Sequence, residues 1–232
     1  MEIGDRDVLS RYLHLPEMYD CENSFVNFFL WQEAYQIEYT LFRGALIIRE
    51  GKRGDNYFRV PLGLQKEDYS ALVGELQCFA GGKVRFGGVC ENQMDLVRDL
   101  FPGTEFVFDR DNSDYVYLQS ELSTFAGRKF HGQKNHLNAF YRSHPDVAYE
   151  VIDGTNRDEC LDFALEWCDE RSAKDTTIGY EKLALQKAFR YYDELGLRGG
   201  ALRFDGRIQA MSVGNKFLVD AADLHFEKAD RS

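Results

Sequence analysis

Two β-hairpin signals, far apart along the chain, constrain its fold most. One turns at Arg43-Gly44 and the other at Asp205-Gly206, and two-residue turns between apolar runs join antiparallel strands. The paired strands are predicted at 36–42 with 45–50 and at 201–204 with 208–213. Apolar residues at helical spacing predict two helices before each hairpin, at 5–15, 24–35, 158–171 and 180–195. The same order of elements therefore occurs twice, which favours an internal structural repeat.

The remaining elements complete a prediction of an α/β chain with mixed sheets. Further strands are expected at 56–61, 83–89, 105–108, 115–118, 147–152 and 216–227, and further helices at 67–79 and 91–101. We predict a first domain at 1–119, a basic helical connector at 120–146 and a second domain at 147–232. The second domain lacks the elements that close the first, so it is expected to be incomplete at its C-terminus or closed by something else.

Composition excludes several classes of protein. The 232 residues are 44% hydrophobic, which is enough to bury a core, and the net charge of -11 argues against general nucleic-acid binding. With neither a leader pattern nor a long apolar run, the chain is predicted to be cytoplasmic and to have no transmembrane segment. Five scattered cysteines without a CxxC pair indicate reduced thiols. The histidines lack partners at ligand spacing, so no metal site is predicted.

The connector carries the densest positive charge in this acidic chain. No carboxylate lies between Glu121 and Asp146, and a helix starting near Lys129 would present a basic side to phosphate groups. The residues predicted to bind phosphate there are Arg128, Lys129, Lys134, Asn135 and Arg142. Lys134 falls in the same sector as apolar residues, so we expect it to face inward. The alternative is an ordinary amphipathic helix with a solvated basic face.

Three motifs carry a resemblance to a known family. They are DYVYLQSELSTFAGRKFHGQKNHLNAF, ALRFDGRIQAMSVG and DLHFEKAD, and they resemble uncharacterised bacterial proteins similar to the C-terminal domain of phosphatidylglycerol lysyltransferase. The element order also resembles the Gcn5-related N-acetyltransferase (GNAT) fold, and two copies in tandem resemble the Fem-type aminoacyl-tRNA-dependent transferases. The resemblance implies two tandem acyl-CoA N-acyltransferase-like (GNAT-like) domains that transfer an acyl or aminoacyl group.

Two departures from the family bear on function. The chain lacks the transmembrane half of the lysyltransferase, which puts a lipid acceptor in doubt. Gln133-Lys134 stands where the family tends toward two adjacent basic residues, so the positive field is expected to be weaker.

The strand predicted at 216–227 would line the acyl-donor cleft of such a fold. Alternation puts Asp223, His225 and Glu227 on one face of it. Glu227 and His225 are the candidate catalytic residues, because a carboxylate or an imidazole can accept the proton of an attacking amine. Glu227 could also hold the ammonium of an aminoacyl donor, with Lys228 and Arg231 facing donor phosphates. The alternative is a half-exposed strand whose polar face is in solvent.

The predicted activity is transfer of an aminoacyl group from aminoacyl-tRNA, or of an acyl group from acyl-CoA, to an amine or hydroxyl acceptor. The residues after Lys228 do not match the glycine-containing donor loop of an acetyl-CoA enzyme. This favours aminoacyl-tRNA over a CoA thioester as the donor substrate. The rival hypothesis is a non-catalytic GNAT-like module that binds an anionic ligand. The sequence predicts no oligomeric state.

Overall fold

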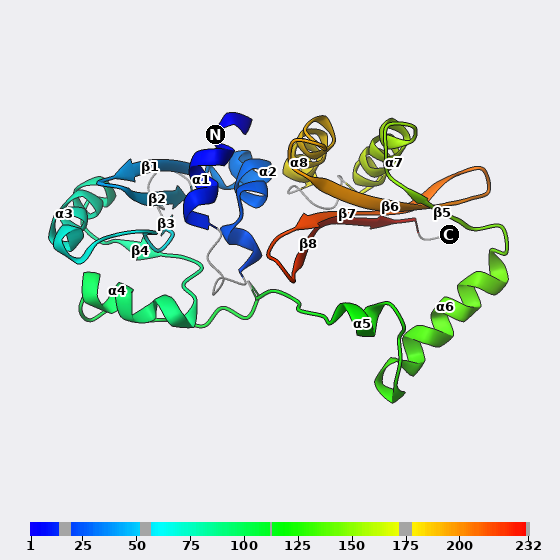
Figure 1. Ribbon diagram of the computed structural model, residues 1–232, viewed down its shortest axis with the longest axis horizontal. Helices are drawn as coiled ribbons and strands as arrows, with labels where there is room; N and C mark the ends of the chain where they lie inside the picture. Colours follow the sequence, from blue (N-terminus) through cyan, green and yellow to red (C-terminus); the bar gives the residue numbers. More distant parts are fainter. Residues whose placement is uncertain (14–19, 52–56, 112, 172–177, 231–232) are drawn as a thin grey trace.

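The computed structural model describes residues 1–13, 20–51, 57–111, 113–171 and 178–230. It has an elongated shape in which two halves lie side by side, each with its own four-stranded sheet (Figure 1). We call the sheet of the first half sheet A and that of the second sheet B; in each, neighbouring strands follow one another along the chain. The α/β class is therefore confirmed. Sheet A is mixed, because one of its strand pairs is parallel, whereas every strand pair of sheet B is antiparallel.

As far as residue 100, the first half follows the predicted order of elements. Its helices are η1 (Ile3–Asp5), α1 (Arg6–Leu13), η2 (Cys21–Asn23), α2 (Phe25–Tyr35), η3 (Lys66–Asp68), α3 (Tyr69–Ala80), η4 (Glu91–Gln93) and α4 (Met94–Leu100). Its strands are β1 (Glu38–Phe42), β2 (Ala45–Glu50), β3 (Tyr57–Phe58) and β4 (Arg85–Phe86). The Ser24 hydroxyl accepts a hydrogen bond from the Asn27 amide and starts α2. Gly81, in the left-handed region, ends α3.

The second half is built around sheet B. Its helices are α5 (Gln119–Leu122), η5 (Arg128–Phe130), α6 (His131–Ser143), α7 (Arg157–Asp169) and α8 (Ile178–Arg190). Its strands are β5 (Ala148–Val151), β6 (Leu197–Phe204), β7 (Arg207–Lys216) and β8 (Ala222–Ala229). β8 starts later than predicted because residues 217–221 form a turn, in which the Phe217 amide donates to the Ala221 carbonyl. α7 and α8 lie together on one face of sheet B (Figure 1).

One hydrophobic core joins the two halves. It includes Leu9 and Phe28 from the first half and Leu185 and Val213 from the second, all of them fully buried. α2 packs against α8, where the ring of Phe29 meets that of Tyr191 edge-on at 5.4 Å. The described residues therefore form one mixed α/β unit of two sheets, because the apolar surface of each half is buried against the other.

The strands predicted at 105–108 and 115–118 are absent. Both segments are extended but belong to neither sheet, and Val107, Tyr115 and Val116 are 88%, 79% and 85% exposed. Their β-branched and aromatic composition favoured a strand, but a strand also needs a hydrogen-bonded neighbour, and no described strand pairs with either segment. Beyond them, α5 and α6 form an arm that stands below sheet B (Figure 1). Within the described part of the chain, no helix is long and apolar enough to cross a membrane.

Candidate functional site

Three acidic side chains meet where the two halves join. Asp20 precedes η2, Asp114 lies between α4 and α5, and Asp223 stands near the start of β8. The Cys21 thiol donates a hydrogen bond to Asp114 Oδ1 at 3.1 Å, and the Cys21 amide donates to Asp114 Oδ2 at 3.3 Å. Ligand atoms of Asp20, Cys21 and Asp114 all lie within 4.8 Å of one another. We call Asp20, Cys21, Asp114 and Asp223 the seam cluster.

A β-bulge in sheet B decides which β8 side chains face the seam. Val213 pairs with Phe226 and Gly214 with Leu224, so His225 is the extra residue and the alternation shifts by one. Asp223 and His225 are enclosed, with side chains 11% and 2% exposed, whereas Glu227 is exposed on the opposite face. The expectation that Glu227 shares a face with Asp223 and His225 is therefore wrong, because simple alternation fails at the bulge.

His225 is held in one tautomer by β7. Asn215 Nδ2 donates to the Lys216 carbonyl at 2.9 Å, which leaves Asn215 Oδ1 to accept from His225 Nε2 at 2.7 Å. The free lone pair of His225 Nδ1 then faces Asp223 Oδ2 at 3.6 Å. Burial lowers the pKa of His225 to about 4, so the imidazole is neutral at physiological pH.

Burial also sets the charge state of the acids. It raises the pKa of Asp223 to about 6, and the negative charge of Asp114 adds to the effect. Asp223 Oδ2 is fully buried and has no hydrogen-bond partner among the described residues. Burial raises the pKa of Asp20 to about 6 as well, although Arg59 opposes it. The pKa of the Cys21 thiol is raised by burial and by its hydrogen bond to Asp114, so Cys21 is not a nucleophile at neutral pH.

Arg59 fixes the seam cluster to sheet A. Its side chain is 8% exposed and donates to the carboxylates of Glu22 and Glu50, while its Nη1 lies 3.7 Å from Asp20 Oδ2. Gly88 has a φ of +60°, a conformation that favours glycine, and a Cβ there would collide with the Arg59 guanidinium. The absence of a side chain at Gly88 therefore leaves room for Arg59. One cation thus faces several carboxyl groups, and the cluster suits a cationic ligand. A metal ion bound by Asp20, Cys21 and Asp114 would require the Cys21 thiol to lose its proton. A substrate ammonium would need only carboxylate oxygens as hydrogen-bond acceptors.

The predicted phosphate-binding residues lie elsewhere, on the arm. The side chains of Arg128, Lys129, Lys134, Asn135 and Arg142 are all exposed. The expectation that Lys134 faces inward is wrong, because no element buries any residue of α6. Lys129 Nζ pairs with Glu121 at 2.6 Å, and Asn135 Nδ2 lies 3.3 Å from His131 Nδ1. Figure 1 places α6 at the far end of sheet B from the seam, so the structure does not bring these cations to the acids.

The Lys228 ammonium is already paired within the protein. Its side chain is buried, with Nζ 2.6 Å from Glu181 Oε1 on α8 and 4.2 Å from the centre of the Trp167 ring on α7. The expectation that Lys228 faces donor phosphates is therefore wrong, because the bulge turns it toward the helices. Arg231 lies outside the described residues.

A hollow of about 360 Å³ opens between α2 and α8, and no predicted site residue lines it. Lys187 in its wall already bonds the Glu33 carboxylate at 2.6 Å and the Phe29 carbonyl at 3.0 Å. The walls of the hollow are partly polar and partly apolar, and the hollow does not bring together several carboxyl groups as the seam cluster does.

Comparison with known proteins finds one matching family and several similar structures, two of which follow. The family model described as phosphatidylglycerol lysyltransferase, C-terminal, matches residues 14–232. A conserved protein of unknown function from Bacteroides thetaiotaomicron is similar over 99% of this chain and 79% of its own, with a TM-score of 0.86 and 29% identity. The C-terminal domain of a putative lysylphosphatidylglycerol synthetase from Agrobacterium fabrum is similar over 98% and 67%, with a TM-score of 0.54 and 13% identity, which bears on the fold alone. No curated protein matches the chain.

Proposed function

The chain belongs to the family of phosphatidylglycerol lysyltransferase C-terminal domains, and from that premise we propose that it transfers an aminoacyl group whose ammonium binds in the seam cluster. Membership confirms the resemblance that the three sequence motifs carried and supports a transferase-type function. The observation that carries the proposal is the Asp223 carboxyl group, which is enclosed and has a buried oxygen without a hydrogen-bond partner among the described residues. An ammonium there would stabilise the ionised carboxyl and relieve the repulsion among the acids.

The transfer step needs an acceptor and a place for its proton. The amine or hydroxyl of the acceptor attacks the carbonyl carbon of the donor ester and the bond from that carbon to the donor oxygen breaks. The proton lost by the acceptor passes through water to the donor oxygen, which leaves as a hydroxyl group. His225 is too enclosed to touch the acceptor, and its Nδ1 lone pair cannot donate a hydrogen bond to Asp223, so His225 does not enter this proposal. Glu227 faces away from the seam cluster and does not enter this proposal.

The arm supports an RNA donor over a CoA thioester. Its exposed cations include Arg128, Lys134 and Arg142, with no acidic residue between Glu121 and Asp146. An aminoacyl-tRNA carries phosphates along its whole length, so cations far from the ester can still position it. The repeated order of two helices, a hairpin and a strand supports two tandem GNAT-like units. The cytoplasmic location stays a prediction.

Transfer assays with labelled donors test the proposal. The purified protein is incubated with lysyl-tRNA, alanyl-tRNA and acetyl-CoA in the presence of amine and hydroxyl acceptors, including phosphatidylglycerol vesicles. We expect transfer from an aminoacyl-tRNA and a loss of at least ~10-fold in kcat/KM for Asp223→Asn, since a charge-assisted hydrogen bond is lost. Asp220→Asn, an exposed site that makes the same change in net charge, is the control. Transfer at the wild-type rate by Asp223→Asn would contradict the assignment.

The rival function is a non-catalytic module that binds an anion through the arm. The exposure of every arm cation favours it. The double variant Arg128→Glu/Lys134→Glu would then abolish RNA binding, Asp223→Asn would leave binding unchanged, and no donor would be consumed.

A further inference from the structure

The segment 115–118 joins the seam cluster to the arm. Just before it, the Asp114 carboxylate accepts hydrogen bonds from the thiol and the amide of Cys21. At its end, the Leu118 carbonyl accepts hydrogen bonds from two amides of α5. The segment belongs to neither sheet and runs along the lower edge of the molecule in Figure 1. Both ends are therefore anchored, while the side chains between them are exposed.

Two exposed tyrosines lie on this segment. Tyr115 and Tyr117 are 79% and 59% exposed, and neither side chain has a hydrogen-bond or ring partner among the described residues. Side chains alternate along an extended backbone, so both rings project to the same side, from Cα atoms about 6.6 Å apart. Stacked bases are about 3.4 Å apart, half that distance. One base therefore fits between the two rings, in contact with both.

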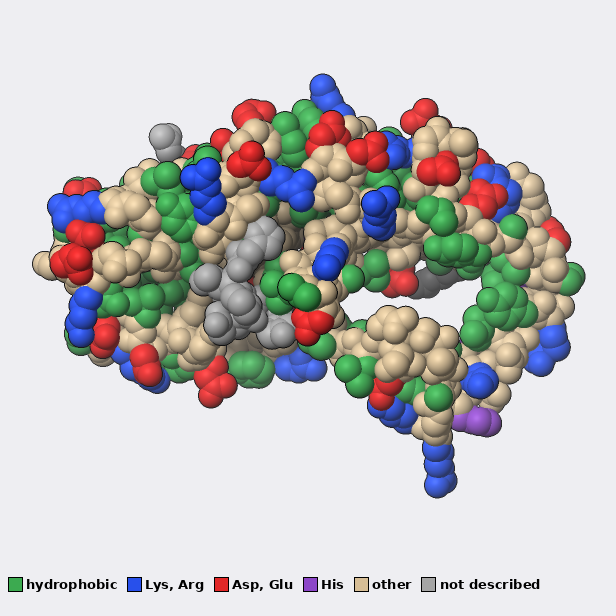
Figure 2. Space-filling view, in the orientation of Figure 1, with side chains coloured by type: hydrophobic (Ala, Val, Ile, Leu, Met, Phe, Trp, Pro, Cys, Tyr) green, Lys and Arg blue, Asp and Glu red, His purple; other side chains and the backbone are tan. Residues whose placement is uncertain are grey.

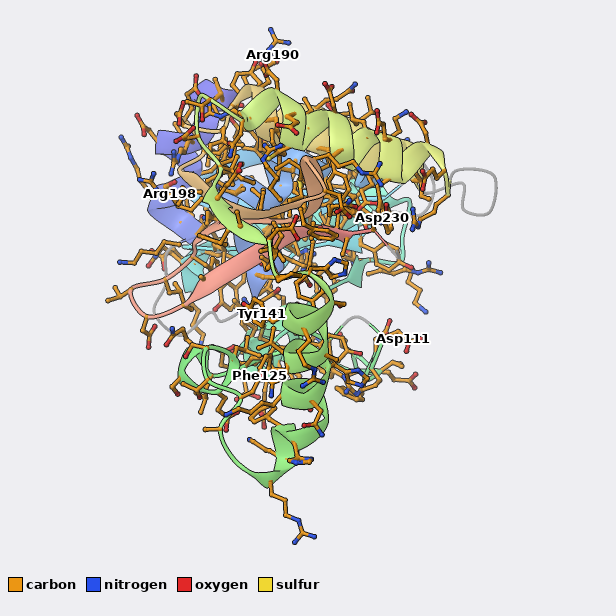
Figure 3. All side chains as sticks on the ribbon, turned by 90° about the vertical axis from the view of Figure 1, so that its right-hand side faces the viewer. Asp111, Phe125, Tyr141, Arg190, Arg198 and Asp230 are labelled. Carbon is orange, nitrogen blue, oxygen red and sulfur yellow. The ribbon has the colours of Figure 1, made fainter. Side chains whose placement is uncertain are left out.

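The segment leads to an opening through the molecule. Figure 2 shows this opening between the arm and sheet B, with hydrophobic side chains along its border. Figure 3 shows Phe125 and Tyr141 on the arm, below the sheet. The arm also carries the exposed cations Arg128, Lys134 and Arg142. Aromatic rings combined with cations are typical of sites for single-stranded nucleic acid, because bases stack on the rings and phosphates meet the cations.

The chemistry of the donor places its last base near the seam cluster. In an aminoacyl-tRNA the amino acid is esterified to the ribose of the unpaired 3′-terminal nucleotide, so only the ribose and the ester separate the base from the amino acid. In an acyl-CoA the pantetheine chain and a diphosphate separate the adenine from the thioester. Tyr115 follows Asp114 directly, so the two rings suit the first arrangement.

We propose that Tyr115 and Tyr117 clamp the 3′-terminal base of an RNA donor whose aminoacyl group occupies the seam cluster. The inference rests on the proposed function, since the ammonium site fixes where the terminal nucleotide lies. Charge explains why rings and not cations stand here. The carboxylates of the seam cluster repel a phosphate, whereas stacking needs no positive charge. The arm cations meet the phosphates of nucleotides farther from the ester.

Binding of an RNA minihelix to the 232-residue chain tests the clamp. The minihelix has four unpaired nucleotides at its 3′ end, 2-aminopurine as the terminal base, and lysine joined to the terminal ribose by a non-hydrolysable amide. We expect saturable binding that quenches the 2-aminopurine fluorescence, with a Kd at least ~10-fold lower than for the same stem without the unpaired nucleotides. Tyr115→Leu and Tyr117→Leu should each raise the Kd by at least ~5-fold and reduce the quenching, because leucine keeps apolar bulk but cannot stack on a base.

Three comparisons separate stacking from other causes. Tyr117→Phe keeps the ring and should bind as the wild type does. Tyr180→Leu removes an exposed tyrosine of α8, on the other side of sheet B, and should also bind as the wild type does (Figure 1). The Kd ratio between Tyr117→Leu and wild type should not vary with salt concentration. Arg128→Glu/Lys134→Glu should instead reduce the salt dependence itself, because only contacts with phosphates release counterions.

Three outcomes would overturn the inference. The first is equal binding, or no binding, of the two RNAs. The second is wild-type binding by Tyr115→Leu and Tyr117→Leu, and the third is an equal loss of binding in Tyr180→Leu. Thermal unfolding of each variant shows whether it remains folded; Tyr115 and Tyr117 are more than half exposed, so little change in Tm is expected.

The binding assay and the transfer assay fail independently. A protein that transfers the aminoacyl group but binds the minihelix without the two tyrosines refutes the clamp and leaves the proposed function standing. A protein that binds the minihelix through the tyrosines but transfers nothing refutes the proposed function and leaves the clamp standing.

Discussion

Replacing Asp223 by asparagine should stabilise the protein at neutral pH, although the position is enclosed and polar. Burial raises the pKa of Asp223 from 3.8 to about 6, so above that pH the folded protein holds a poorly solvated carboxylate. Each pH unit between the folded and unfolded pKa values corresponds to about 1.4 kcal/mol, which gives an upper bound of ~3 kcal/mol. Asparagine carries no charge and removes this cost. We expect a gain of about 1–3 kcal/mol in the free energy of unfolding at pH 7.5.

The sign of the pH dependence follows from proton binding. Between pH 3.8 and about 6 the folded state holds the Asp223 proton more tightly than the unfolded chain does. The contribution of Asp223 to stability is therefore complete below pH 3.8 and is lost as the pH rises through about 6. His225 acts in the opposite direction, because its folded pKa is lowered, but it is present in both proteins and largely cancels in the difference. The gain from Asp223→Asn should thus be near zero at pH 4 and full by pH 7.5.

Urea unfolding followed by circular dichroism at pH 4, 5.5 and 7.5 measures this difference. Asp220→Asn makes the same change in net charge at an exposed site and should stay within about 0.5 kcal/mol of wild type at every pH. If Asp223→Asn destabilises the protein at pH 7.5, or its effect does not vary with pH, the carboxylate has a stabilising partner and the reasoning fails. A gain in stability together with a loss of transfer is the signature of a binding residue, because such sites hold polar groups ready for a ligand.

Three further predictions concern stability and use urea unfolding at pH 7. Lys228→Met should cost about 3 kcal/mol, because it leaves the Glu181 carboxylate without its cation; Lys228→Arg should cost less. Gly88→Ala should cost about 1–3 kcal/mol, because the φ of Gly88 is +60° and the new methyl group would meet the buried Arg59 guanidinium. Gly74→Ala, in open space on α3, is the control and should stabilise the protein by up to about 1 kcal/mol. Ser24→Ala should cost about 1 kcal/mol through loss of the α2 cap, and Ser24→Asp should retain most of the stability; equal values for the two would contradict the capping argument.

Several features could be read from short stretches of sequence. The turns at Arg43-Gly44 and Asp205-Gly206 both form hairpins, with φ of 48° and 53° at Arg43 and Asp205. Ser24 caps its helix and Gly81 ends another. Each of these signals works within a few residues, where the backbone conformation and its hydrogen bonds are set by neighbours in the chain.

The seam cluster could not be predicted in the same way. Asp20, Asp114 and Asp223 come from three distant parts of the chain, and no spacing links them. One partial signal was present, since alternation placed Asp223 on a polar strand face, but the bulge at His225 changed which residues accompany it. The arm misled the prediction for a related reason. Apolar spacing on α6 suggested a buried face, yet Leu137 and Tyr141 are exposed and Phe140, which packs against Phe204, is only half-buried.

The sequence by itself determined the helices, the hairpins and the excess of acidic charge, because these depend on local conformational preference and composition. Only the tertiary structure decided which carboxyl groups share an enclosed space, which cations stay in solvent and which face of sheet B stays open. Those properties depend on the burial of one segment against another far along the chain, and burial is what shifts a pKa and leaves a polar atom without a partner.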